Sequence, residues 1–557
     1  MIDIALSPLV TGLAVAALGA VYWLGWCVYC LWFHPLAKYP GPRLAAISET
    51  WFIWSWTTGR YPMILEDTHK KYGDIVRISP NELSFATVQA HRDIYSTPSR
   101  ARKPFLKCGM FYNNGDVTNV FYELDPAQHA KMRKALAPGF TGTAVKGQEH
   151  LIHRYVDMFV RKVGEISEGS WGQGVDMGEA MRWLAFDVMG ELTFGESFNA
   201  VATGKTHLWI TLLTDSAHAA ILPSFVRRAP SLVLVLPFLL SISAIRNLRK
   251  HYAYTLATVR RRVERQRQRQ HHLTPYHNQQ QQEKRDILTP LLEPKEKKKG
   301  GESGGGVYGA NVTEKQLVSL MQAMVIAGAD TATVAMTTAV YFLCATPRAL
   351  EAVQDEVRAL GYEQLNGVEL PKLKYLNAVI EESMRCFPPI AFGLPRVSPG
   401  ETIDGVYIPQ GVRVSVSQWV LHHNPSVWDS PHEFRPERWL ADHNSPPSNP
   451  PVSSPTTNSA YPPKPPPTAA AFPFSSGPRS CLGIAQAYLE MRISIAKLVH
   501  AYDMQLARDP GDWVGQARME MLWKKGPLMV RMQPRSRFVA EVGPAMEKEK
   551  EKETELI

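Results

Sequence analysis

One cysteine stands in the most distinctive segment of the chain, Phe474-Ser-Ser-Gly-Pro-Arg-Ser-Cys481-Leu-Gly, directly before a stretch with helical spacing from Ile484 to about Val499. A helix dipole and nearby backbone amides favour the thiolate form of a cysteine at such a helix start. The flanking glycines let the main chain approach a flat cofactor closely. These features suit Cys481 as an iron ligand, whereas a lone cysteine beside a turn is more often simply a buried free thiol.

A carboxylate and a guanidinium, Glu382 and Arg385, stand three residues apart on an apolar segment with helical spacing. Residues at this spacing share one face of a helix. An exposed pair of this kind stabilises a helix by only a few tenths of a kcal/mol. From the spacing alone, we expect an ordinary exposed ion pair.

A carboxylic acid and a hydroxyl, Asp330 and Thr331, follow Ala327-Gly-Ala in the middle of a long apolar segment. The Thr331 hydroxyl can bond the carbonyl of Ala327 one turn back and loosen the helical ladder there. The alternative is an ordinary helix that tolerates a glycine.

Two further segments carry cationic groups that suit paired carboxylates. Asp125-Pro126 starts a predicted helix on which His129 and Arg133 are four residues apart, and Arg396 follows Pro388-Pro389. Taken by itself, His129 is typical of a surface histidine.

Together these segments resemble the cytochrome P-450 superfamily, and the resemblance extends over nearly the whole chain. Two other segments, Phe33-His-Pro-Leu-Ala-Lys-Tyr-Pro-Gly-Pro42 and Tyr72-Gly-Asp-Ile-Val-Arg-Ile-Ser-Pro-Asn81, are similar to its membrane-bound members from filamentous fungi. The haem-binding loop of that family matches in order at Phe474, Gly477, Arg479, Cys481 and Gly483. The resemblance implies that Cys481 is the axial thiolate ligand of the haem iron. It also implies that Phe474 packs beside the sulfur and that Arg479 holds a haem propionate.

The resemblance implies roles for the other segments as well. Asp330 and Thr331 would form a proton relay beside a groove for dioxygen and water. Ala332 stands where many relatives carry Thr or Ser, a departure that bears on a secondary hydrogen bond and not on the relay itself. The further residues implied to contact the propionates are His129, Arg133 and Arg396. Those implied to form a buried structural network are Glu382, Arg385 and Arg438.

The elements that must position these residues are mainly helical. Thr313-Glu-Lys-Gln316 is a capping box that predicts a long helix towards Ala345, and Thr346-Pro347 predicts a second helix to Leu360. A smaller β portion is predicted from Thr402 to Ser417, with a turn at Asp404-Gly405. The predicted fold class is mainly α with small β-sheets (α+β), as the resemblance to the P-450 fold implies.

The N-terminal segment carries no charge from Ile4 to Phe33 and is rich in aromatic residues towards its end. This pattern is typical of a transmembrane helix, and it is longer than the core of an ordinary signal peptide, the alternative. Lys38 and Arg43 follow the span while Asp3 precedes it, so we expect a single-pass anchor in the endoplasmic reticulum with the catalytic domain in the cytosol. The prolines at 35, 40 and 42 around Gly41 predict a stiff, non-helical connector after the span. The predicted organisation is an anchor at 4–33, a proline-rich hinge at 34–50, a catalytic domain at 51–540 with flexible insertions near 266–310 and 444–467, and a charged disordered tail at 541–557.

Composition excludes some classes of protein. The 557 residues are 45% hydrophobic, enough for a large core, and the net charge of +9 is dispersed, which argues against nucleic-acid binding. The six cysteines are scattered without the density of a secreted disulfide scaffold, which favours a reducing compartment.

The function implied by the resemblance is haem-dependent monooxygenation. One oxygen atom from O2 would enter a hydrophobic small molecule, by hydroxylation or epoxidation in the biosynthesis of a terpenoid, polyketide or alkaloid. The cofactor would be haem b, and electrons would come from NADPH through a separate cytochrome P-450 reductase, since the chain shows no nucleotide-binding module of the Gly-x-Gly-x-x-Gly type. Cytochrome b5 is a second candidate partner. The alternatives are a haem-thiolate isomerase or dehydratase, and a catalytically silent haem-binding membrane protein. The Asp330–Thr331 pair argues against both.

Overall fold

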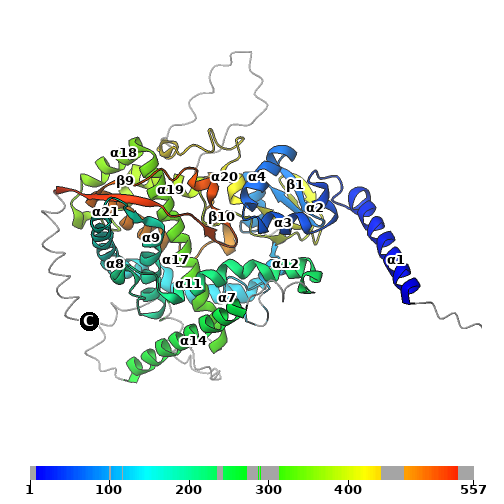
Figure 1. Ribbon diagram of the computed structural model, residues 1–557, viewed down its shortest axis with the longest axis horizontal. Helices are drawn as coiled ribbons and strands as arrows, with labels where there is room; N and C mark the ends of the chain where they lie inside the picture. Colours follow the sequence, from blue (N-terminus) through cyan, green and yellow to red (C-terminus); the bar gives the residue numbers. More distant parts are fainter. Residues whose placement is uncertain are drawn as a thin grey trace, which may run out of the picture. The chain divides into compact units, whose positions relative to one another are not determined.

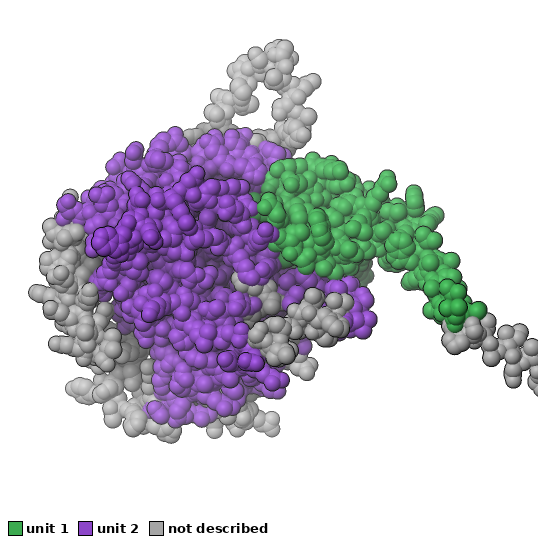
Figure 2. All heavy atoms as spheres, in the orientation of Figure 1, with its two compact units in different colours: residues 1–108, 392–421 green, residues 109–391, 422–557 purple. Residues whose placement is uncertain are grey.

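The computed structural model describes residues 8–98, 102–113, 115, 117–234, 242–271, 287, 289, 313–440 and 469–536. The chain divides into two compact units, shown in green and purple in Figure 2. Unit 1 comprises residues 1–108 and 392–421, and unit 2 comprises residues 109–391 and 422–557. The expected catalytic domain at 51–540 therefore contains parts of both units. The expected insertions lie largely, and the expected tail wholly, outside the described residues.

Unit 1 begins with the apolar helix α1 (Pro8–Val28), which continues into a π-helical turn, η1 (Tyr29–Phe33) (Figure 1). Large apolar side chains are exposed along α1, among them Leu13 and Leu18. The span Leu9–Phe33 has 25 residues, and a helix of ~20 apolar residues can cross a bilayer. The helix is thus consistent with the expected membrane anchor.

The expected hinge is not helical at residues 34–42, where its prolines lie, as predicted. It contains the short helix α2 (Arg43–Ile47), and Leu36 is fully buried. The backbone amide of Arg77 donates to the Pro40 carbonyl at 2.8 Å, and Arg77 Nη1 donates to the Cys30 carbonyl at 2.7 Å. Past the prolines, α2 packs against the first strand of unit 1. The last turn of the expected anchor, at Cys30, belongs to the same packed region.

A five-stranded sheet forms the centre of unit 1. Its strand order is β1 (Ile75–Ser79), β2 (Glu82–Phe85), β8 (Arg413–Val416), β5 (Arg396–Val397) and β3 (Leu106–Lys107). β2 and β8 are parallel, and every residue of both is buried. The separate hairpin of β6 (Glu401–Ile403) and β7 (Val406–Ile408) turns at Asp404 and Gly405, both with positive φ, which confirms the predicted turn. The helices of unit 1 beyond α2 are α3 (Thr50–Thr57), α4 (Tyr61–Tyr72), α5 (Val88–Tyr95) and most of α20 (Gln418–His422).

Unit 2 is mostly helical. Its longer described helices are α7 (Pro126–Leu136), α8 (Gly142–Gly169), α9 (Met177–Phe194), α11 (Leu208–His218), α14 (Ile242–His271), α17 (Glu314–Ala345), α18 (Pro347–Arg358), α19 (Lys374–Cys386) and α21 (Ile484–Ala501). The shorter ones are α6 (Gly109–Tyr112), α10 (Ala200–Thr203), α12 (Leu222–Arg228) and α22 (Trp513–Gln516). The described 3-10 turns are η2 (Ala137–Phe140), η3 (Ala219–Ile221), η4 (Pro230–Leu234), η7 (Tyr362–Gln364), η8 (Leu370–Lys372), η9 (Pro436–Trp439) and η11 (Gly477–Arg479).

The long helix α17 is the core helix of unit 2. It starts at the predicted capping box, in which Thr313 and Gln316 bond each other's backbone amides, and it ends at Ala345 as predicted. It packs against α9, α19 and α21 (Figure 1). Although α17 is apolar enough to cross a membrane, 61% of its most apolar stretch is buried in the protein, as expected for a core helix.

The sheets of unit 2 are small. One has the order β4 (Val175–Asp176), β12 (Met529–Pro534) and β9 (Tyr502–Leu506), and the other pairs β10 (Arg518–Met519) with β11 (Trp523–Lys524). The predicted β portion at 402–417 did not include them. Helix α18 ends at Arg358, two residues before the predicted Leu360. The fold class, mainly α with small sheets, is confirmed.

Candidate active site

Cys481 lies between a strained loop and a helix in unit 2. The loop contains Ser475 and Gly477 with φ of 59° and 68°, a region that L-residues other than glycine rarely adopt. It is closed by a hydrogen bond from the Cys481 amide to the Phe474 carbonyl at 2.9 Å, and α21 starts at Ile484. All six cysteines lie in the described part of the chain, and Cys481 alone among them is exposed.

The surroundings of the Cys481 sulfur act on its ionisation in opposite directions. Many protein atoms surround the sulfur even though the residue is accessible, and this partial desolvation raises the pKa of the thiol. The backbone amide of Gly483 and the charge of Arg133 oppose the rise, because both stabilise the thiolate. Gly483 and Arg133 are thus the groups that favour a metal-binding form of Cys481.

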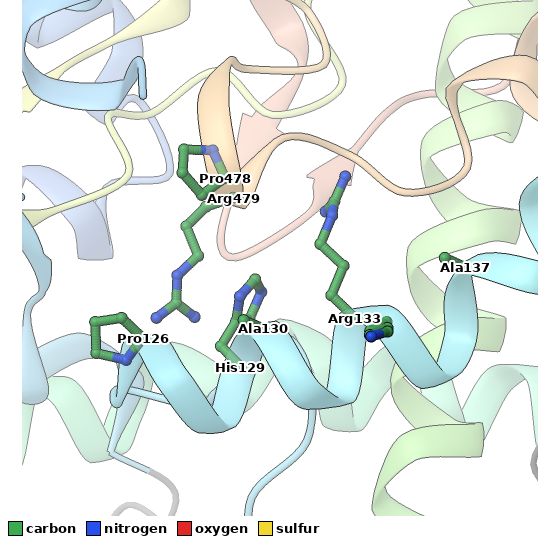
Figure 3. A pocket seen from close by; sticks show the side chains of 8 residues that line it. Pro126, His129, Ala130, Arg133, Ala137, Pro478 and Arg479 are labelled. Atoms are coloured by element: carbon green, nitrogen blue, oxygen red, sulfur yellow. The ribbon is translucent and has the colours of Figure 1, made fainter. Parts of the chain in front are cut away.

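A cavity of about 350 Å³ lies between α7 and the Cys481 loop (Figure 3). Helix α7 starts at Pro126, where the Asp125 carboxylate accepts a hydrogen bond from the Gln128 amide and caps the helix as predicted. The residues that line the cavity are Pro126, His129, Ala130, Arg133, Lys134, Ala137, Pro478 and Arg479. The structure therefore brings together three of the residues implied to contact propionates, His129, Arg133 and Arg479.

The two arginines reach across this cavity from opposite sides (Figure 3). Arg133 points from α7 to the loop, where its Nη1 donates to the Ser480 carbonyl at 2.6 Å. Arg479 points from the loop to the chain before α7, where its Nη1 donates to the Glu123 carbonyl at 2.7 Å. Both arginine side chains thus line the cavity, and each guanidinium group is held by oxygen atoms of the chain segment on the opposite side.

Arg396 belongs to unit 1, whereas Cys481 belongs to unit 2. Arg396 lies on β5, is almost fully buried, and its guanidinium lies 5.1 Å from the centroid of the Tyr95 ring. Its implied contact with a propionate therefore stays a prediction.

The middle of α17 has the hydrogen bond expected there. Thr331 Oγ1 donates to the Ala327 carbonyl at 2.6 Å. A Cβ at Gly328 would lie 2.6 Å from Met189 Sδ on α9, so a larger residue there would require the flexible Met189 side chain to shift.

Asp330, next to Thr331, is buried. Burial raises the pKa of its carboxyl, and the charges of Lys525 and Arg182 oppose that rise. Burial in turn lowers the pKa of Lys525 to about 8, while Asp330 acts to raise it. Neither cationic neighbour was predicted from the sequence, because both are distant in the chain and belong to no motif.

Glu382 and Arg385 are fully buried, so the exposed pair expected from spacing alone was wrong. Arg385 donates two hydrogen bonds of 2.8 Å to the Glu382 carboxylate, and Arg438 Nε donates a third at 2.9 Å. Trp439 Nε1, which the sequence analysis missed, donates to Glu382 Oε2 at 2.9 Å. The structure thus brings together the three residues of the implied network and adds a fourth, the neighbour of Arg438.

A family model described as cytochrome P-450 matches residues 47–532 of the chain. The chain belongs to the cytochrome P-450 family. It is 35% identical to cytochrome P-450 monooxygenase BOA3 of Botryotinia fuckeliana, over 89% of this chain and 91% of that protein. It is 34% identical to the monooxygenase poxC of Penicillium oxalicum, over 91% and 92%, and 31% identical to the monooxygenase astD of Aspergillus oryzae, over 93% and 92%.

As a P-450, the protein is an oxidoreductase of the monooxygenase type that uses haem b and takes electrons from NADPH through a reductase. The side chains present fit this cofactor. An accessible cysteine at a helix start supplies a sulfur ligand for iron, and His129, Arg133 and Arg479, whose side chains suit carboxylates, line the cavity beside its loop.

Proposed function

We propose that this P-450 inserts one oxygen atom from O2 into an apolar small molecule, as a hydroxylation or epoxidation step in fungal secondary metabolism. The observation that carries the proposal is that unit 2 holds both an accessible Cys481 and the hydrogen-bonded Thr331 beside a buried Asp330. The fungal monooxygenases to which the chain is similar support the reaction type. A terpenoid, polyketide or alkaloid substrate is proposed from the resemblance to filamentous-fungal members.

In this proposal Cys481 binds the haem iron, and haem supplies the redox centre that activates dioxygen. Phe474 packs beside the sulfur, and Gly477 and Gly483 allow the main chain to approach the ring. The residues proposed to hold the propionates are His129, Arg133, Arg396 and Arg479.

Thr331 and Asp330 are proposed to deliver protons. The Thr331 hydroxyl donates its proton to the Ala327 carbonyl, and this bond orients the group. The lone pairs of its oxygen can then accept a hydrogen bond from a proton donor. The buried Asp330 binds a proton more readily than an exposed aspartate does, because burial raises its pKa. Lys525 and Arg182 limit that rise and keep the carboxyl able to release the proton again.

The proposed location is the endoplasmic reticulum membrane, with α1 as a single-pass anchor and the catalytic domain in the cytosol. The exposed apolar side chains of α1 and the charges Lys38 and Arg43 after it support this topology. An NADPH–cytochrome P-450 reductase on the same face of the membrane would supply electrons, and cytochrome b5 is proposed as a second electron donor.

The test is turnover of the full-length protein in membranes with a reductase and NADPH, using a panel of apolar terpenoids, polyketides and alkaloids under isotopically labelled dioxygen. The expected result is a product that carries one labelled oxygen atom and forms only when NADPH is present. Conversion that needs neither NADPH nor dioxygen would contradict the proposal and indicate an isomerase or dehydratase.

A further inference from the structure

A second polar cluster lies on the two helices that flank the Cys481 loop. Tyr488 on α21 donates a hydrogen bond of 2.5 Å to Glu381 Oε1 on α19. The Tyr488 ring also packs against the Phe474 ring, with 5.2 Å between the ring centroids and 50° between the planes. Tyr488 thus connects α19 to the first residue of the loop that carries Cys481.

The same two helices also hold the ring of Tyr488. Arg492, one turn further along α21, places its guanidinium 4.9 Å from the centroid of the Tyr488 ring. Arg492 Nε donates to Asn377 Oδ1 on α19 at 2.6 Å, and Asn377 Nδ2 donates to the Leu373 carbonyl at 2.6 Å. The tyrosine is therefore fixed by a hydrogen bond at its hydroxyl and by a cation at its ring.

The loop needs such support because its backbone is strained. Ser475, a residue other than glycine, has a φ of 59°, and conformations of this kind persist only where the surroundings enforce them. The backbone bond from Cys481 to the Phe474 carbonyl closes the loop. It does not fix the Phe474 side chain, which Tyr488 contacts directly.

We infer that Tyr488, through its hydrogen bond to Glu381, is a positioning residue that holds Phe474 in place and so fixes the surroundings of the Cys481 sulfur. The inference rests on the proposed role of Cys481 as the haem ligand. Tyr488 itself does not touch the reacting atoms; it acts through Phe474. The packing around a metal-bound sulfur controls how closely water approaches it, and this sets the reduction potential of the metal.

The test compares Tyr488→Leu and Tyr488→Phe in the full-length haem protein. The leucine removes both the aromatic contact and the hydrogen bond, whereas the phenylalanine removes only the hydrogen bond. The matched control is Tyr375→Phe, because Tyr375 on α19 donates a similar bond of 2.8 Å to Glu437, which lies outside the Cys481 loop. The readouts are the haem reduction potential and the rate at which the reduced carbonyl adduct loses the Soret band typical of a thiolate ligand.

Tyr488→Phe is expected to raise the potential and to accelerate the loss of the thiolate band roughly ten-fold, the factor for one lost hydrogen bond to a charged group. Tyr488→Leu should change both in the same direction but more, because it also loses the aromatic contact, and Tyr375→Phe should match the wild type. Wild-type potential and band lifetime in both Tyr488 variants would overturn the inference alone. A wild-type protein without a thiolate band would instead overturn the assignment of Cys481, and this inference with it.

Discussion

Glu382 illustrates how burial changes the energetic meaning of a charged pair. Burial alone would raise the pKa of its carboxyl, but the hydrogen bonds and charges of Arg385 and Arg438 lower it below its usual range. Because the pKa is lower in the folded protein than in the unfolded chain, ionised Glu382 stabilises the fold above its unfolded pKa. That contribution is lost as the pH falls through the folded pKa.

Replacing Glu382 by Ala should therefore destabilise the protein by about 3–5 kcal/mol near neutral pH, because it leaves two buried guanidinium groups without their carboxylate. The control is Glu369→Ala, which breaks a pair of the same i, i+3 spacing with Lys372 at 2.7 Å but on the surface. That change should cost less than about 1 kcal/mol. The measurement is the midpoint of chemical unfolding of the detergent-solubilised full-length protein at neutral and acid pH. Equal effects of the two substitutions would contradict the structural role of Glu382.

A second single-residue change, Thr331→Val, tests the proposed proton delivery. Valine keeps the shape of threonine but loses the hydroxyl, so the haem spectrum and substrate binding should persist while product per NADPH consumed falls about ten-fold or more, with peroxide released instead. The control is Thr338→Val on the same helix, whose hydroxyl also bonds a carbonyl one turn back, that of Val334 at 2.7 Å. A coupled measurement of NADPH, peroxide and product checks this. Unchanged coupling in Thr331→Val would remove its hydroxyl from the reaction.

At the scale of elements, the proline-rich segment after the anchor is held against a strand by a close backbone contact. A Cβ at Gly41 would lie 2.3 Å from the backbone oxygen of Arg77 on β1. Gly41→Ala should therefore destabilise the protein by about 1–3 kcal/mol. Gly19→Ala in α1, where a Cβ would meet nothing within 4 Å, is the control and should leave the midpoint of unfolding unchanged. A Gly41→Ala protein as stable as the control would show that the segment does not pack on β1.

Local signals in the sequence were sufficient for some elements and not for others. The capping box at Thr313 and the apolar run behind it predicted α17 to the residue at both ends, because both signals act within one helix. The parallel pairing of β2 with β8 joins residues more than 300 positions apart, such as Leu83 with Val414. No local pattern specifies such a pairing, and the sequence analysis predicted only the 402–417 part of the β structure.

The same distinction applies to the site. The order of residues around Cys481 was sufficient to predict the family, because a motif is a local pattern. The partners of those residues were not predicted: Lys525 beside Asp330, Trp439 on Glu382 and Tyr488 against Phe474 are brought together only by tertiary packing. Of these partners, only Trp439 is adjacent in sequence to a predicted member of its network, Arg438. Its membership of the network could therefore have been predicted.

At the scale of the whole molecule, we expect that the N-terminal segment can be deleted without loss of packing as far as Val28, and not as far as Phe33. Cys30 is fully buried, and its carbonyl accepts a hydrogen bond from Arg77, which is itself only 2% exposed. Deleting residues 1–28 should release much of the protein from membranes while leaving stability and haem content largely intact. Deleting residues 1–33 should release it equally but destabilise it by about 1–3 kcal/mol, because Arg77 loses a buried acceptor. Fractionation and unfolding midpoints of the two truncated proteins compare these outcomes; equal stability would show that the Cys30 contact is dispensable.

The central claim is that Cys481 binds the haem iron as a thiolate, and the spectrum of the reduced carbonyl adduct tests it most directly. Cys481→Ala should abolish the long-wavelength Soret band typical of a thiolate ligand. Cys344→Ala, on α17, is the control and should keep the band, because burial raises the pKa of the Cys344 thiol to about 12 and disfavours its thiolate. A thiolate-type band that persists in Cys481→Ala would contradict the account and assign the iron to another cysteine.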